Sequence, residues 1–211
     1  IGKTSFERRI NSGLAVGFSF LKTAFENSNF IFNQIDIANT YTNDIVLQHE
    51  RSIYTDVIKA IDIESNELID FTTTMHSSKD SYAISKRDRP LAYIIKKNNY
   101  GFIDKLDDVG VKYVEFERDT MIYSGGYKVV EFNNNFKVYE KMKMQKVVTS
   151  IEYSNNKFSK GDILISMSQK RSNLIAELLE PEAPNSYVSF GIIKTSLNKQ
   201  LPIYRIKNFN N

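Results

Sequence analysis

The 211-residue chain contains no cysteine, which excludes disulfide scaffolds, thiol catalysis and sulfur-ligated zinc. It also lacks an apolar run of the roughly 18 residues that a membrane-spanning helix needs, so we expect no membrane span. A strong excess of one charge is missing too, since 28 Lys and Arg residues against 25 Asp and Glu residues leave a net charge of +3. Nucleic-acid-binding proteins usually carry a larger and more clustered basic excess, so we expect no nucleic acid as a partner.

The composition is typical of a folded globular protein, with 41% hydrophobic and 25% charged residues. The length suits one large domain or two small ones. The chain begins with Ile1 instead of Met, and no signal segment follows. We therefore expect it to be processed or to be part of a longer polypeptide. The residues themselves predict no cellular compartment, because a secreted protein of this size can fold without disulfides.

Residues 1–48 carry the pattern of a helical segment. Apolar side chains recur at spacings of three and four, which is typical of one buried helix face. The members of this stripe are Phe6, Ile10, Leu14, Phe18, Leu21 and Phe25. A second, less regular helix is predicted over Phe30 to Gln48.

From Arg51 onward β-branched residues become frequent. Residues 53–63 and 68–74 predict two strands joined by a polar turn at 64–67. Residues 77–89 are polar and end at Pro90, which predicts an irregular connector.

A strand–helix–strand unit is predicted next. Residues 91–95 predict a short apolar strand, 100–109 a helix and 111–116 another strand. Gly110 stands where a helix C-terminal glycine belongs. This order indicates a right-handed crossover onto a parallel sheet.

The last third of the chain predicts alternating strands and one helix. Small or polar residues predict hairpin turns at Gly125-Gly126, at Asn133-Asn134-Asn135 and at Asn155-Asn156. The further predicted elements are strands over 147–153, 162–167 and 203–206 and a helix over 172–180.

Together these elements predict an α/β or α+β fold, with a mixed sheet and packed helices after an N-terminal helical segment. We place the helical segment at 1–48 and a C-terminal domain at 50–211. In the last helix, four aliphatic residues share one face, which predicts burial in the core and not a partner surface; they are Leu174, Ile175, Leu178 and Leu179. Pro181 then ends this helix, because proline has no backbone donor.

No local metal or catalytic signature is present. His49 and His76 have no carboxylate three residues away, whereas a zinc site normally needs three ligands of the His, Asp or Glu type. Gly-x-Ser-x-Gly elbows and phosphate-binding loops are absent from the sequence. Solvation explains the carboxylate pair Asp107-Asp108 adequately. We therefore predict no catalytic, cofactor-binding or metal-binding residue in this chain.

One basic cluster has two interpretations. Lysines alternate with aromatic and apolar residues over 137–147, a combination also found on nucleic-acid-binding surfaces. These lysines are Lys137, Lys141, Lys143 and Lys146. Lysines on an exposed strand also protect it from edge aggregation, and Glu131 and Glu140 lie in the same stretch. We favour the solvated strand face and keep nucleic-acid binding as an alternative.

The C-terminal third resembles a known family. Its motifs are Gly161-Asp162-Ile163-Leu164-Ile165, then Gln169, then Leu174-Ile175-Ala176-Glu177-Leu178-Leu179-Glu180-Pro181, then Asn185-Ser186, then Pro202-Ile203-Tyr204-Arg205-Ile206. This pattern resembles the C-terminal region of bacterial zinc carboxypeptidases of the carboxypeptidase A-like family.

Two upstream stretches match the same family. The run Arg89-Pro90-Leu91-Ala92-Tyr93-Ile94-Ile95 resembles a family motif, with Lys96 where the family has proline. The start, Ile1 to Arg9, resembles the segment that follows the catalytic glutamate. Residues 50–85 match least.

The resemblance implies a parent polypeptide that is a zinc-dependent exopeptidase, which removes C-terminal residues from peptides. In that family zinc polarises the scissile carbonyl and activates water. The zinc ligands and the catalytic glutamate would lie upstream of Ile1, so this chain would hold no zinc. Glu7 is the one tempting catalytic carboxylate here, but a capping box with Thr4 explains it better.

The resemblance also implies partners and a location. The expected partners are the upstream peptidase domain of the same polypeptide, the parent's peptide substrate and a second copy of the chain bound through the exposed N-terminal helix. A secreted or periplasmic location is expected for the parent. The alternative function, from a different class, is a free-standing module that binds peptide or glycan and has no catalytic role.

Overall fold

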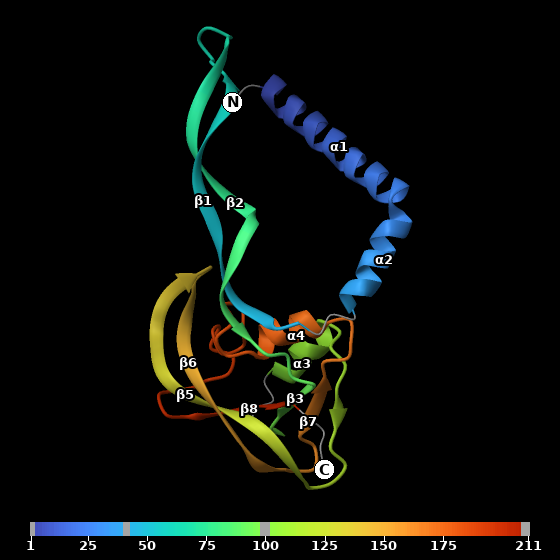
Figure 1. Cartoon of the computed structure of the whole chain (residues 1–211), viewed down its shortest axis with the longest axis vertical. Helices are drawn as coiled ribbons and strands as arrows, with labels where there is room; N and C mark the ends of the chain where they lie inside the picture. The colour runs from blue at the N-terminus through green and yellow to red at the C-terminus, as the bar shows by residue number, and fades with distance from the viewer. Residues whose placement is uncertain (1–2, 40–42, 98–101, 208–211) are drawn as a thin grey trace. The chain divides into compact units, whose positions relative to one another are not determined.

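The structure is a computed structural model that describes residues 3–39, 43–97 and 102–207 (Figure 1). The chain divides into two compact units, Ile1–Thr42 and Asn43–Asn211. Each unit is described by itself below.

The first unit is helical. It contains α1 (Lys3–Glu26) and α2 (Ser28–Asn39). The apolar stripe of α1 is exposed within the described chain, with Phe6 64% and Phe18 62% exposed. The second predicted helix is shorter than expected, because the chain enters a strand at Ile45. Ile45 and Leu47 are buried and Val46 is exposed, which is the alternation of a half-buried strand and not of a helix.

The second unit begins with a long antiparallel ribbon of β1 (Ile45–Ile61) and β2 (Leu68–Arg87). The expected turn closes it: Asp62 N–H donates to the Glu67 carbonyl at 2.9 Å. The irregular connector predicted over 77–89 is wrong up to Arg87, because its backbone pairs with β1, as in Ser77 opposite Ser52. Polar side chains gave no sign of this pairing, which depends on backbone groups.

A six-stranded sheet forms the body of the second unit. Its spatial order is β4-β7-β3-β8-β5-β6. The strands are β3 (Ala92–Ile95), β4 (Val114–Glu115), β5 (Thr120–Tyr139), β6 (Met142–Phe158), β7 (Ile163–Ser166) and β8 (Gln200–Ile206).

The expected combination of helices and strands is confirmed, but every pair of neighbouring strands in the described chain is antiparallel. The mixed sheet is therefore corrected to an antiparallel one. The strand–helix–strand unit does connect two strands of the same direction, β3 and β4. However, β7 lies between them and pairs antiparallel with both, so the crossover does not create a parallel pair.

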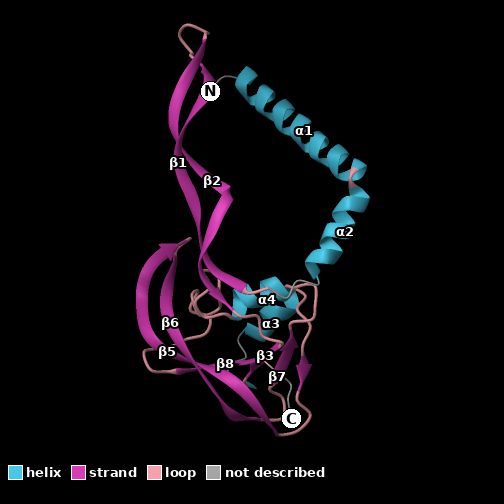
Figure 2. Cartoon of the chain, viewed as in Figure 1, coloured by secondary structure: helices cyan, strands magenta, loops and turns pink. Residues whose placement is uncertain are grey.

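Two helices pack on one face of this sheet, as predicted. They are α3 (Ile103–Asp108) and α4 (Ser172–Leu179), drawn in cyan in Figure 2. Leu106 of α3 and Leu179 of α4 join a single core cluster with Tyr93 of β3. Gly110 ends α3 with φ of +68°, as a C-terminal glycine should, and Tyr100 of the predicted helix lies outside the described residues. In α4, Ile175 and Leu179 are buried and Leu174 and Leu178 are half-buried.

The three predicted hairpin turns are wrong. The glycine pair, the asparagine triplet and Asn155-Asn156 all lie inside β5 or β6. The real turn is at Glu140 and Lys141, whose φ values of 46° and 69° are those of a type I′ hairpin. A Cβ on Gly125 would lie 2.7 Å from the Ile151 side chain, so this glycine permits close strand packing and makes no turn.

Candidate functional site

A buried carboxylate lies at the end of α4. The helix stops at Leu179, and Glu180 takes an extended conformation before Pro181. Its fully buried side chain accepts three hydrogen bonds. The hydroxyls of Tyr93 and Tyr127 donate to Oε1 at 2.5 and 2.8 Å, and Arg87 Nη1 donates to Oε2 at 2.6 Å. Burying this charge is tolerable because it is paired and hydrogen-bonded.

Arg87 connects this carboxylate to a second one. Its Nη2 donates to Glu182 Oε1 at 3.1 Å. The backbone N–H and the hydroxyl of Thr149 donate to the same oxygen at 2.8 and 2.7 Å. The guanidinium also lies 5.5 Å from the ring centroid of Tyr127. The network therefore joins β2, β3, β5, β6 and the end of α4.

The electrostatics of this network hold its protons in place. Burial raises the pKa of both Tyr93 and Tyr127 well above the ordinary value, and the Glu180 charge raises it further. Burial opposes the charge of Arg87, but the two carboxylates and Tyr127 more than offset it, and its pKa is raised. The tyrosines therefore remain neutral donors and Arg87 remains a cation. Such an arrangement of paired and hydrogen-bonded groups stabilises the fold.

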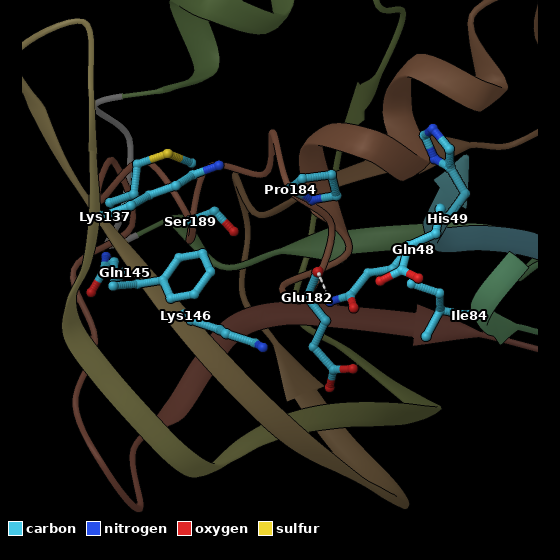
Figure 3. A pocket seen from close by; sticks show the side chains of 12 residues that line it. Gln48, His49, Ile84, Lys137, Gln145, Lys146, Glu182, Pro184 and Ser189 are labelled. Atoms are coloured by element: carbon cyan, nitrogen blue, oxygen red, sulfur yellow. Dashed lines mark hydrogen bonds between the residues drawn. The ribbon is translucent and has the colours of Figure 1, made fainter. Parts of the chain in front are cut away.

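A separate cavity of about 270 Å³ opens beside this network. Figure 3 shows that its walls come from the base of the β1–β2 ribbon, from the β5–β6 hairpin and from the segment after α4. The lining residues are Gln48, His49, Glu50, Ile84, Phe136, Lys137, Met144, Gln145, Lys146, Glu182, Pro184 and Ser189. A small apolar cavity with a few polar groups is the usual form of a ligand site.

Most polar groups of the cavity already have partners within the fold. Gln145 Nε2 donates to the Val188 carbonyl at 2.8 Å, and Ser189 Oγ donates to the Ala183 carbonyl at 2.8 Å. Glu50 accepts from the Tyr82 hydroxyl at 3.0 Å, and Glu182 is held by Arg87 and Thr149. Within the described chain, Lys137 and Lys146 have no carboxylate within 4 Å.

The structure divides the predicted basic cluster. Lys137 and Lys146 line the cavity, whereas Lys141 and Lys143 do not. The two cavity lysines lie around one aromatic ring: their Nζ atoms are 5.8 and 5.3 Å from the Phe136 centroid. Lys141 occupies the hairpin turn and is exposed. The cluster is thus partly a solvated hairpin and partly a cavity wall.

His49 and His76 lie at different points of the β1–β2 ribbon. His49 is opposite Ala83 and His76 is opposite Ile53, four residues further along β1. At about 3.3 Å per residue they are roughly 13 Å apart along the ribbon, too far to share one ion. Among the described residues no group of three His, Asp or Glu side chains could hold a metal. The residues present therefore do not fit a zinc site.

Glu7 lies near the start of α1 and is exposed. The side chain of Thr4 is outside the described residues, so the capping box stays a prediction. Asp107 accepts from the Tyr113 hydroxyl at 3.2 Å, a local contact at the end of α3. No described helix is long and apolar enough to cross a membrane.

The sequence did not predict that these residues form one network around Glu180. Glu180, Tyr93 and Arg205 all belong to the motifs that carry the family resemblance, so the motifs were a signal for it. Arg205 is fully buried and pairs with Asp88, its Nη1 lying 3.5 Å from Oδ1. Arg87 and Tyr127 gave no signal, because one lay in a predicted connector and the other in a predicted hairpin.

Comparison with known proteins adds relatives of named activity. "Carboxypeptidase 2" of Trichophyton equinum is 30% identical over 216 residues, which cover 98% of this chain and 39% of that protein. "Carboxypeptidase 2" of Trichophyton tonsurans and of Trichophyton rubrum are 28% and 29% identical, again over 98% of this chain and 39% of theirs.

The chain is carboxypeptidase-related. It spans about two fifths of the length of these curated relatives, and the remainder of each relative lies outside the matched part. The relatives are fungal, whereas the motifs resembled bacterial proteins. No family model and no solved structure matches the chain. The sequence identity to the three fungal proteins confirms that the chain is related to carboxypeptidases.

Proposed function

We propose that this carboxypeptidase-related chain is the non-catalytic C-terminal portion of a zinc metallocarboxypeptidase, which removes C-terminal residues from peptides. One observation carries the proposal: a match over 98% of this chain that covers only 39% of proteins named carboxypeptidase. The zinc ligands and catalytic residues would belong to the rest of the longer polypeptide. In keeping with a structural role for the family motif, its last two residues, Glu180 and Pro181, are buried.

The experiment compares two polypeptides. The 211-residue chain and a longer one extended upstream are purified, and zinc content and release of the C-terminal residue from a blocked peptide are measured. We expect the longer polypeptide to contain zinc and hydrolyse the peptide, and the shorter chain to do neither. The upstream sequence should contain His-x-x-Glu and a later His. Stoichiometric zinc in the shorter chain, lost in His49→Ala or His76→Ala, would contradict the proposal.

The exposed stripe of α1 is part of the same proposal. Phe6, Ile10, Leu14 and Phe18 are each more than half exposed. Apolar surface of this extent marks an interaction site. In the longer polypeptide the upstream peptidase domain would cover it, and the isolated chain would self-associate through it. Light scattering should then show a mass that rises with concentration, and Phe6→Ser with Phe18→Ser should abolish the rise.

The second candidate function is a free-standing peptide- or glycan-binding module. The cavity beside Glu182 and Pro184 favours it, since this cavity combines apolar residues with two lysines that have no carboxylate within 4 Å among the described residues. Binding without any activity of the longer polypeptide would support the module over the proposal above.

A further inference from the structure

The lining of the cavity at the base of the ribbon includes two lysines, Lys137 and Lys146. Lys137 and Lys146 lie around the same Phe136 ring, and within the described chain neither has a carboxylate within 4 Å. Both ammonium groups are exposed and lie beside one ring, so an anion that enters the cavity would be attracted by two positive charges. The glutamates of the wall have other partners: Glu182 is held by Arg87 and Thr149, and Glu50 accepts from the Tyr82 hydroxyl.

Four apolar residues also line the cavity. Ile84 is 52% exposed and Phe136 is 46% exposed, so both present surface that a ligand could cover. Met144 and Pro184 complete this side of the cavity. In Figure 3, Lys137 and Lys146 extend from the hairpin toward Pro184 and Glu182, and Ile84 and His49 lie on the opposite wall. A fitting ligand has an anionic group next to an apolar group.

The size restricts the ligand further. Ligand cavities for drug-sized molecules usually measure about 300–1,000 Å³. At about 270 Å³ this cavity suits a single residue better than an oligosaccharide. The C-terminal residue of a peptide has both required groups, a carboxylate and, when the residue is apolar, a hydrophobic side chain.

We propose that this cavity binds the apolar C-terminal residue of a peptide, with its free carboxylate on Lys137 and Lys146 and its side chain against Ile84 and Phe136. The peptide as the source of the carboxylate rests on the proposed function, since such peptides are the substrates of a carboxypeptidase. The cavity would act as a holding site for peptide ends.

The test measures binding to the 211-residue chain by NMR titration. The probes are N-acetyl-Ala-Phe with a free carboxylate, the same dipeptide with a C-terminal amide, and a galacturonate trimer. We expect the free acid to bind, the amide to bind about fivefold to tenfold more weakly, and high salt to remove the difference. Equal binding of acid and amide, or tighter binding of the trimer at the same residues, would overturn the proposal.

Two double variants with the same charge change locate the site. Lys137→Gln with Lys146→Gln should weaken the free acid about fivefold to tenfold and leave the amide unchanged. Lys141→Gln with Lys143→Gln, on the same hairpin but outside the cavity, should change neither. If both double variants weaken binding equally, the effect is one of net charge and the proposal is wrong.

Circular dichroism and melting temperature establish that each variant is folded. The salt dependence of the unmodified chain tests the same contact without any substitution.

Binding is measured here without hydrolysis. Absence of activity in the longer polypeptide would therefore reject the proposed function, whereas absence of binding in this chain would reject only the cavity.

Discussion

Two regions of the second unit reverse the usual placement of charged and apolar side chains. Around Glu180 the core contains a fully buried carboxylate, a fully buried Arg205 and two buried tyrosine hydroxyls. Along the β1–β2 ribbon, large aliphatic side chains are exposed, with Ile53 64% and Leu68 67% exposed. Residue type alone therefore does not determine burial. Glu180 is buried with three hydrogen-bond donors, and Arg205 is buried beside the Asp88 carboxylate.

The two regions also differ in how they are held. Glu180 and the side chains that bind it belong to five elements joined by one hydrogen-bonded network. The ribbon is two strands of 17 and 20 residues, far longer than the usual five or six, and it is anchored at its base by Ile45 and Leu47. A two-stranded ribbon in isolation is only marginally stable. Substitutions should therefore have large effects in the core and small ones along the ribbon.

The largest effect should come from Glu180→Gln. The change leaves Arg87 buried with one of its two carboxylate partners removed, and breaking a buried pair costs about 3–5 kcal/mol. Urea unfolding of the chain measures this free energy. The control is Glu177→Gln, one turn earlier in α4, where the carboxylate accepts hydrogen bonds only from Asn185 among the described residues. A loss of about 1 kcal/mol is expected there. Equal losses would mean that burial of the charge is irrelevant.

The next effect should come from Leu179→Ala. This side chain is fully buried under the sheet, and removing it should cost about 2–5 kcal/mol of unfolding free energy, measured in the same urea assay. Leu68→Ala on the ribbon, where the side chain is 67% exposed, should cost less than about 0.5 kcal/mol. Similar costs at both positions would show that something covers the ribbon in solution.

The sequence predicted the core better than the ribbon. Spacing and Pro181 located α4 to within a residue, and Gly110 located the end of α3, because local rules determine helices and their ends. The network could not be predicted in this way. Arg87 and Glu180 are 93 residues apart, and only the folded sheet brings them together.

The strands β5 and β6 were harder to predict from the sequence, and the reason is physical. Asn155-Asn156 is typical of a turn, yet Asn156 Nδ2 donates to the Ser124 carbonyl across the β5–β6 pair at 3.0 Å. Cross-strand partners therefore override local propensity. The cavity was missed for the same reason. The spacing of Lys137 and Lys146 predicted an exposed strand face, and the residues that make it a cavity wall come from three distant segments.

A smaller effect is expected from pH, because two tyrosines of the Glu180 network have shifted pKa values. Tyr93 and Tyr127 have raised pKa values in the folded state, whereas their unfolded pKa is near 10.0. As the pH rises above 10 the unfolded chain loses these protons first. Stability is therefore retained below that pH and falls by about 1.4 kcal/mol per pH unit for each tyrosine above it.

Urea unfolding at pH 8, 10 and 11 measures this fall. The double variant Tyr93→Phe with Tyr127→Phe should be less stable at pH 8 and should show a shallower fall between pH 10 and 11. An unchanged slope in the double variant would place the titrating groups outside the network.

The smallest effect should come from the ribbon's own ion pair. Lys59 and Asp70 face each other across β1 and β2, and their side chains are 66% and 60% exposed. An exposed pair of this kind contributes at most about 1 kcal/mol, because water and salt screen it. Asp70→Asn should therefore lower the unfolding free energy by less than about 1 kcal/mol, and the difference should vanish at high salt. A loss as large as that of Glu180→Gln would mean that this part of the ribbon is buried in solution. The contrast between a buried Glu180 network and an exposed ribbon would then be wrong.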